Sequence, residues 1–202
     1  WRFVDELDSP LGMALTGGIL YVVDRNTVRR YDWPGLSPRD VVELPTRVAN
    51  DIAVAADGTM YVSDSAAASV VVIDPDGSAT TLDADIDFEN ANGMAIDGDV
   101  LLIGGQRLWR YDLASAEVTV LGEEWLTDID GIELEGDGVL QLSQVGGPVV
   151  RLFPGGQSQV LGGEGVSSAN HGYSRALRLA VVPTGFDNTI IALRVPAGPA
   201  AR

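Results

Sequence analysis

The feature that most constrains the fold is a repeat of about 40 residues that covers nearly the whole chain. Five segments of similar pattern begin 39, 42, 38 and 40 residues apart. Their starts are Leu11 in "LGMAL", Asn50 in "NDIAV", Asn92 in "NGMAI", Asp130 in "DGIEL" and Asn170 in "NHGYS". Each start is followed by further short apolar stretches, such as "GGILYVVD" and "DGTMYVSD", with Gly- and Asp-rich turns between them. Short strands joined by such turns form antiparallel hairpins and meanders.

A period near 40 residues with four strands in each unit is typical of a β-propeller blade. The competing repeat classes fit less well, because helical solenoids need helices and β-helices usually have shorter periods. The sequence therefore predicts an all-β fold, a β-propeller of five four-stranded blades. We expect a single domain over residues 1–195 and a disordered tail over residues 196–202.

The two ends of the repeat region suggest how the ring closes. The fifth repeat contains only three strands and ends near Val195. Residues 1–8, "WRFVDELD", form an additional predicted strand before the first repeat. Pairing this strand beside residues 189–195, "TIIALRV", would complete the last blade and remove two open sheet edges.

Composition excludes several classes of partner and site. Without cysteine, the chain has neither disulfides nor thiolate metal sites, and its single histidine excludes a typical zinc site. The net charge of −16 comes from 29 acidic and 13 basic residues, which disfavours binding to nucleic acid or to anionic membranes. No apolar run approaches the roughly 18 residues of a membrane span. We expect a monomer with a small-molecule ligand in its central channel.

Four of the five repeats begin with a polar side chain that carries an oxygen: Asn50, Asn92, Asp130 and Asn170. In a propeller the innermost strands line the central channel, so their first residues gather at one mouth. Asn and Asp also end turns by bonding to nearby backbone, and this alternative interpretation is open for each residue taken singly. Carboxylate and amide oxygens suit calcium, magnesium or manganese. Four such residues at one repeat position favour a ligand or metal site at the mouth.

The segments "NDIAVAADGTMYVSDS", "ANGMAIDGDVLLI", "DIDGIELEGDGVLQLS" and "NHGYSRALRLAVVPTGFDNTIIALRV" resemble the gluconolactonase/senescence marker protein (regucalcin-like) family of β-propellers. The ending is most similar to the secreted or periplasmic bacterial branch, which implies that location. Members of the family usually have six blades. The first of those blades, with its acidic metal ligand, has no counterpart in this chain.

The resemblance implies roles for particular residues. Asn92 and Asp130 match two ligands of the family's divalent cation, and Asp130 also matches the acid that activates water. Asn50 matches a residue near the metal and the substrate. Asp51 follows Asn50 directly, Asn170 is the fifth start position and His171 follows it; these three residues are further candidates for substrate binding. The family's third ligand, a glutamate, is missing, and Leu11 cannot replace it, so we expect weak metal binding.

Two functions follow as alternatives. The first is a divalent-metal-dependent hydrolase of lactones or small esters, in which the cation polarises the carbonyl group and Asp130 takes a proton from water. The second is a non-catalytic propeller that binds a small molecule or a protein partner. The resemblance favours the first alternative, and the missing blade favours the second.

Overall fold

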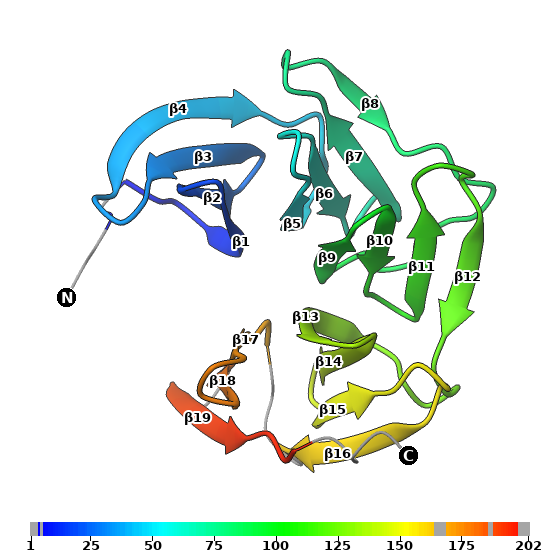
Figure 1. Ribbon diagram of the computed structural model, residues 1–202. Helices are drawn as coiled ribbons and strands as arrows, with labels where there is room; N and C mark the ends of the chain where they lie inside the picture. The colour runs from blue at the N-terminus through cyan, green and yellow to red at the C-terminus, as the bar shows by residue number, and fades with distance from the viewer. Residues whose placement is uncertain (1–3, 5, 164–168, 186–187, 198–202) are drawn as a thin grey trace.

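The computed structural model describes residues 4, 6–163, 169–185 and 188–197. Five antiparallel sheets stand around a central axis, and the first strand of each sheet lies innermost (Figure 1). This arrangement is a five-bladed β-propeller and confirms the predicted fold. Among the described residues, no helix is long and apolar enough to cross a membrane.

The first four blades each have four strands. The first contains β1 (Pro10–Thr16), β2 (Ile19–Asp24), β3 (Thr27–Asp32) and β4 (Ser37–Glu43). The second contains β5 (Ala49–Val54), β6 (Met60–Asp64), β7 (Ser69–Ile73) and β8 (Ala79–Thr81). The third contains β9 (Met94–Asp97), β10 (Val100–Ile103), β11 (Leu108–Asp112) and β12 (Val118–Leu121). The fourth contains β13 (Ile129–Gly136), β14 (Val139–Gln144), β15 (Val149–Leu152) and β16 (Ser158–Gly162).

The fifth blade has three described strands: β17 (Gly172–Ser174), β18 (Leu179–Thr184) and β19 (Thr189–Arg194). The predicted closing strand is not formed by those of residues 1–8 that the structure describes. Val4 and Glu6 instead line a surface pocket with Tyr31 and Arg39 of the first blade. Residues 1–3 and 5, which carry the rest of this prediction, lie outside the described residues, as do residues 198–202 of the predicted tail.

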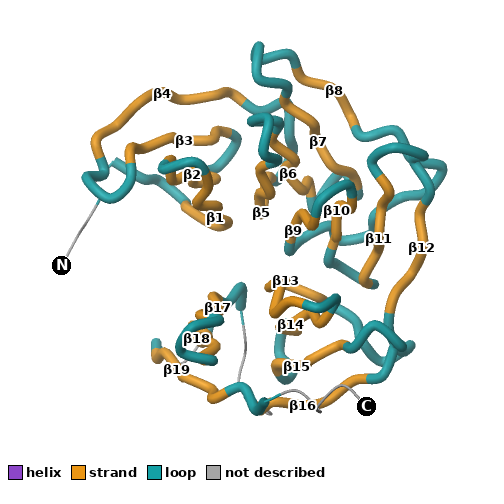
Figure 2. The backbone as a smooth tube through the Cα atoms, viewed as in Figure 1, coloured by secondary structure: helices purple, strands orange, loops and turns teal. Residues whose placement is uncertain are grey.

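Tight turns keep consecutive strands antiparallel, as the alternating strand and loop segments of Figure 2 show. Leu15 pairs with Leu20 and Thr16 with Ile19, so only Gly17 and Gly18 connect β1 to β2. Both glycines have positive φ, 58° and 75°, as a two-residue hairpin turn that follows the strand twist requires. The Gly-Gly pair in the sequence is therefore a direct requirement of the hairpin.

The hydrophobic core lies between neighbouring blades. One buried cluster joins the first and second blades through residues such as Val23, Val28 and Val62. A second cluster joins the second and third blades, and a third joins the third and fourth. Side chains on both faces of a sheet are therefore buried where it has a blade on each side, which explains why the strands read as nearly continuous apolar runs.

A buried carboxylate at the end of β2 fixes the chain segment that enters β1, and another at the end of β6 fixes the segment that enters β5. Asp24 Oδ1 accepts hydrogen bonds from the backbone N–H groups of Asp8 and Ser9, at 2.9 and 2.7 Å. Asp64 accepts them in the same way from Arg47 and Val48, at 2.7 and 3.0 Å. This repeated bond accounts for the Asp that ends both "YVVD" and "YVSD" and holds the chain segment before β1 and β5 in place.

Candidate functional site

The structure links two of the polar start positions directly. Asn92 precedes β9 and hydrogen-bonds the carboxylate of Asp130 on β13 in the next blade. Burial raises the pKa of Asp130, and the bond from Asn92 partly offsets this rise. Asn50 on β5 donates to Ser65 Oγ at 3.0 Å, and Ser65 Oγ donates to the Ala91 carbonyl at 2.6 Å. Asn92 and Asp130 therefore form a pair between blades, whereas Asn50 is engaged within a separate chain of bonds.

Two cavities are lined by five of the six predicted site residues, and Asp130 is among the lining residues of neither. The smaller, of about 380 Å³, is lined by Asn50 and Asn92 together with Ser65. The larger, of about 980 Å³, runs along the inner strands and is lined by Asp51, Asn170 and His171. It also reaches residues of β1 and of the fifth blade, so it lies between the first and last blades. The predicted residues thus surround one channel region but do not all face a single pocket.

Asp51 is a buried carboxyl group, only 4% exposed, that connects the second and third blades. Its Oδ2 accepts a hydrogen bond from the backbone N–H of Met94 at 2.8 Å. Its Oδ1 is buried and has no hydrogen-bond partner among the described residues. Burial, together with the charges of Asp130 and Glu133, raises its pKa to about 7, although backbone hydrogen bonds partly oppose the rise. Asp51 therefore exchanges a proton near neutral pH, inside the larger cavity.

Glu133 on β13 is a residue of the cavity that sequence reasoning missed. Burial raises its pKa to about 7, and a hydrogen bond from the backbone N–H of Tyr173 partly opposes the rise. The repeat alignment carried a signal for it. The fourth residue of the first three repeats is Ala14, Ala53 and Ala95, and the fourth repeat has Glu133 in the same place. An acid at an inner-strand position that is alanine in three of the five repeats indicates a group directed toward the channel.

His171 is a buried neutral imidazole beside the channel, 6% exposed. Its Nδ1 lies 3.1 Å from Ser143 Oγ, and its Nε2 has no partner in the part of the chain that the structure describes. Burial lowers its pKa to about 4, so the ring is uncharged at neutral pH. The Ser143 hydroxyl fixes one ring nitrogen and leaves the other for a ligand in the cavity.

The residue after each start position lies where neighbouring inner strands come close together. This explains why three of these five residues are glycine. A Cβ atom on Gly12 would lie 2.1 Å from Asp51 Oδ1, and one on Gly93 would lie 2.4 Å from the Asp130 carbonyl oxygen. A Cβ on Gly131 would lie 2.8 Å from His171 Nδ1 of the fifth blade. The glycines of "LG", "NG" and "DG" are therefore required for close approach of the blades, and the second and fifth repeats place Asp51 and His171 at the same position.

The donor set at Asn92 and Asp130 can be compared with what a divalent cation needs. Asn92 Oδ1 is buried without a hydrogen-bond partner in the described residues, and Asp130 adds a carboxylate. Both are oxygen ligands of the type that calcium and magnesium prefer. The described residues contain no group of three or more His, Asp or Glu side chains that could hold a metal ion. The pair fits a hard cation in chemical type and leaves most of the coordination to water or substrate.

The sequence matches no protein-family model and no curated protein. Its fold is similar to a catalytically inactive virginiamycin B lyase from Staphylococcus aureus with quinupristin, with 16% identity and a TM-score of 0.72, over 93% of this chain and 66% of that one. It is also similar to a streptogramin B lyase, with 14% identity and a TM-score of 0.66, over 94% and 70% of the two chains. A third neighbour comes from a nidogen/laminin complex, with 18% identity and a TM-score of 0.76, over 91% and 74%. The chain thus spans about two thirds to three quarters of these structures, and the likeness establishes the β-propeller fold without favouring the gluconolactonase family.

Proposed function

We propose that the protein is a hydrolase of lactones or related small esters, with its site where the inner strands line the channel. The observation that carries the proposal is the gathering of perturbed ionisable groups there. Burial raises the pKa values of Asp51 and Glu133 to about 7, raises that of Asp130, and lowers that of His171 to about 4. Groups whose protonation changes near neutral pH suit general acid–base catalysis, and they cluster at functional sites.

Asp130 is the best candidate for the group that takes a proton from water. The carboxylates of Asp51 and Glu133 each accept a backbone N–H bond from the next blade, from Met94 and Tyr173. The bond to Asp130 comes from the Asn92 side chain, which can reorient without a change in the backbone. Its raised pKa makes it a stronger base than an ordinary aspartate.

A divalent cation would be held by Asn92 and Asp130 in this proposal. When bound, it would polarise the carbonyl group of the substrate. Two protein ligands predict weak binding, in the millimolar range or near it, since calcium takes about six to eight oxygen ligands. The chain's own contribution is to orient the substrate, to exclude water with the apolar cavity wall and to provide the base.

A non-catalytic binding platform is the second candidate function. It is favoured by the absence of a three-residue acidic or imidazole cluster in the described part of the chain, and by the apolar Leu11 at the first start position. Propellers serve unrelated functions: the neighbours include two lyases and a protein from a nidogen/laminin complex.

Replacement of Asp130 by Asn tests the hydrolase proposal. The amide keeps the shape and most hydrogen bonds but cannot accept the proton or supply a full charge. We expect Asp130→Asn to weaken calcium or manganese binding at least about tenfold, or 1.4 kcal/mol, and to abolish lactone hydrolysis. The measurements are calorimetric titration with each metal and hydrolysis of a panel of sugar lactones and small esters. Asp97→Asn, which removes one exposed carboxylate from β9, is the matched control.

The outcomes separate the two functions. A wild-type protein that binds no divalent cation at millimolar concentration and hydrolyses none of the panel would leave only the binding platform. An Asp130→Asn variant that binds metal and hydrolyses lactones like the wild type would show that Asp130 is not the base.

A further inference from the structure

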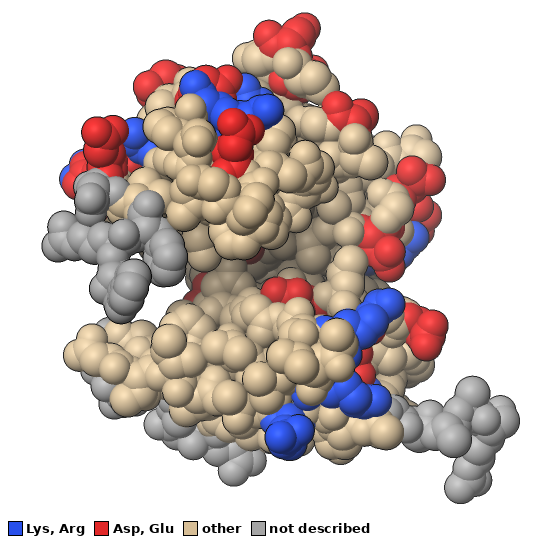
Figure 3. Space-filling model, turned by 60° about the vertical axis from the view of Figure 1, so that its left-hand side comes forward, with Lys and Arg blue, Asp and Glu red and all other residues tan. Residues whose placement is uncertain are grey.

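The larger cavity has an apolar wall, to which the hydrolase proposal assigns only the exclusion of water. Its lining includes Met13 and Leu15 of β1 and Val181 and Ile190 of the fifth blade. These side chains are 62%, 52%, 39% and 71% exposed, respectively. Figure 3, turned so that the side with β1 and β17–β19 comes forward, shows the surface hollowed between its upper and lower parts. Large apolar side chains that line a hollow are a surface for the hydrocarbon or aromatic part of a ligand.

The formal charges in the same cavity are all of one sign. Asp51 and Glu133 line it, whereas the described lining residues include no arginine, and the chain has no lysine. His171 is neutral because burial lowers its pKa to about 4. A cavity with two acids and no base attracts cations and repels anions, and its low-dielectric walls strengthen both effects.

Two residues that line the cavity each have a buried polar atom that lacks a partner. Asp51 Oδ1 and His171 Nε2 belong to residues that are 4% and 6% exposed, and neither atom has a hydrogen bond within the described chain. Buried polar atoms are nearly always hydrogen-bonded, and exceptions in native proteins often mark a missing ligand or water. These two atoms therefore point to a bound molecule independently of the acidic charge.

We propose that this cavity binds an organic cation with an apolar body, which places an amine or guanidinium group against Glu133 and Asp51 and its hydrocarbon or aromatic part against Met13, Leu15, Val181 and Ile190. The proposal rests on the proposed function in taking the channel as the ligand site, and it adds the chemical class of the ligand. Glu133 and Asp51 are held by the backbone N–H groups of Tyr173 and Met94, so they are positioned before the ligand arrives. An ammonium group supplies several donors for the lone pairs of these two carboxylates.

Three probes that share one apolar body and differ in charge test the proposal. They are 2-phenylethylammonium, the uncharged 2-phenylethanol and the anionic 3-phenylpropionate, each titrated into the full chain by calorimetry at pH 8 and about 0.15 M salt, where surface attraction is screened. We expect the cation to bind at least tenfold more tightly than the alcohol, and the anion to show no binding.

Two variants locate the charge preference. Glu133→Gln should reduce the advantage of the cation over the alcohol to less than about threefold. Glu43→Gln removes an exposed carboxylate of β4 and changes the net charge equally, so it should keep the wild-type advantage. If Glu133→Gln does not fold, the ranking of the three probes on the wild type decides the matter alone.

Equal binding of the three probes, tighter binding of the anion, or no binding of any probe at 10 mM would overturn the proposal, as would an unchanged preference in a folded Glu133→Gln variant. Binding is measured without turnover. Failure of lactone hydrolysis would therefore leave this proposal standing, and failure of probe binding would leave the Asp130 proposal standing.

Discussion

Asp51 shows how one residue combines a structural and a chemical role. Its backbone N–H donates to Ser63 Oγ at 2.9 Å, and its carboxylate accepts the Met94 N–H, so it ties the inner strands of the second and third blades together. Gly12 leaves room for its second oxygen. A buried carboxylate costs free energy when it is ionised, and that cost is what raises its pKa to about 7.

The stability of the protein should therefore depend on pH through Asp51. Its pKa is about 7 in the folded protein against an ordinary value of 3.8, so the folded state holds the proton more tightly. The corresponding stabilisation is complete below about pH 3.8 and is lost as the pH rises through 7. Asp51→Asn keeps the acceptor and removes the ionisation. We expect it to exceed the wild type in Tm at pH 8 by about 2–4 °C or more, and the difference to shrink toward pH 5.

Thermal unfolding followed by circular dichroism at pH 5, 6, 7 and 8 measures this difference. The contribution of His171 to stability has the opposite pH dependence, because its lowered pKa favours the folded state at higher pH. This contribution is the same in the wild type and in Asp51→Asn, so it cancels in the Tm difference. Asp57→Asn is the control, since the backbone N–H of Thr59 lowers the pKa of this carboxyl. A Tm difference between Asp51→Asn and the wild type that does not vary with pH would contradict the account of Asp51.

At the residue scale, part of the site could be predicted from the sequence. The repeat alone identified the start positions, and Asn92 and Asp130 do meet between blades. Glu133 was missed because the prediction considered only the first two residues of each repeat. The bond from Asn50 to Ser65 could not be foreseen, since Asn50 lies on β5, Ser65 follows the end of β6, and the register of these two strands is set only by folding.

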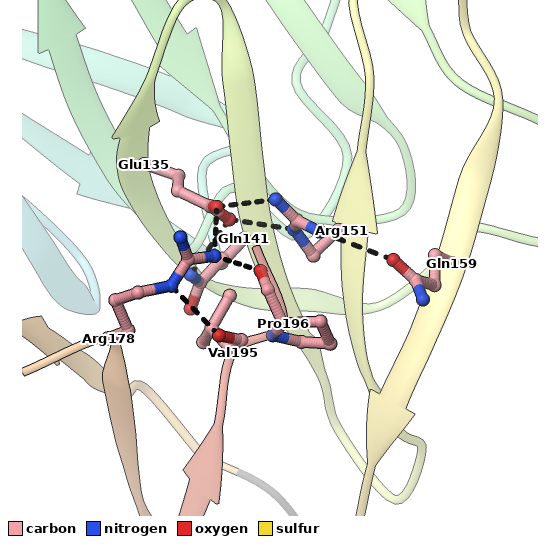
Figure 4. A network of polar contacts seen from close by, with 7 residues as sticks. All are labelled: Glu135, Gln141, Arg151, Gln159, Arg178, Val195 and Pro196. Atoms are coloured by element: carbon pink, nitrogen blue, oxygen red, sulfur yellow. Dashed lines mark hydrogen bonds and ion pairs between the residues drawn. The ribbon is translucent and has the colours of Figure 1, made fainter. Parts of the chain in front are cut away.

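At the scale of strands, the fourth and fifth blades are joined by a buried ionic network (Figure 4). Arg151 on β15 is 1% exposed and binds the Glu135 carboxylate of β13 with two nitrogens, while Nη1 donates to Gln159 Oε1 at 3.3 Å. Arg178 of the fifth blade lies 4.0 Å from Glu135 and donates to the Val195 carbonyl at 3.1 Å. The Glu135 carboxylate thus balances the charge of the buried Arg151 guanidinium and also contacts Arg178 of the next blade.

Removing the Glu135 carboxylate should lower the free energy of unfolding. Glu135→Gln leaves the Arg151 charge buried without its counter-ion, and breaking such a pair usually costs about 3–5 kcal/mol. We expect urea unfolding to show a loss of at least about 3 kcal/mol. Arg39→Gln breaks the exposed ion pair with Asp32 and should cost less than about 1 kcal/mol. A Glu135→Gln variant as stable as the Arg39→Gln control would show that the network contributes little.

The strands themselves were largely predictable, because each consists of a short apolar stretch bounded by turn residues. The predicted pairing of the two chain ends is not seen among the described residues. Such a pairing would join residues that are far apart in sequence, and the period of the repeat carries no information about it. The described residues near the N-terminus pack on the first blade, where Asp8 and Ser9 bond to Asp24 and extend the loop bonding of that blade.

At the scale of the whole molecule, the five inner strands surround a channel in which acidic groups are buried, although the chain carries a net charge of −16. On the surface, water screens such charges, and turn bonds stabilise the ionised form of carboxyls such as Asp57 and Asp76. Inside the channel the same type of group resists ionisation. This contrast within one molecule is the basis of both proposals, because a proton acceptor or a partner for a cation must be held away from water.

The most direct test is a ¹³C NMR titration of the side-chain carboxyl groups of the wild-type protein. The account predicts that Asp51 and Glu133 titrate with pKa values of about 7, whereas Asp57 and Asp76 titrate below the ordinary value of 3.8. Adding 2-phenylethylammonium should lower the first two pKa values by at least about one unit and leave the turn carboxyls unchanged. Ordinary pKa values near 4 for Asp51 and Glu133 in the folded protein would contradict the central claim that the channel holds buried, reactive carboxyl groups.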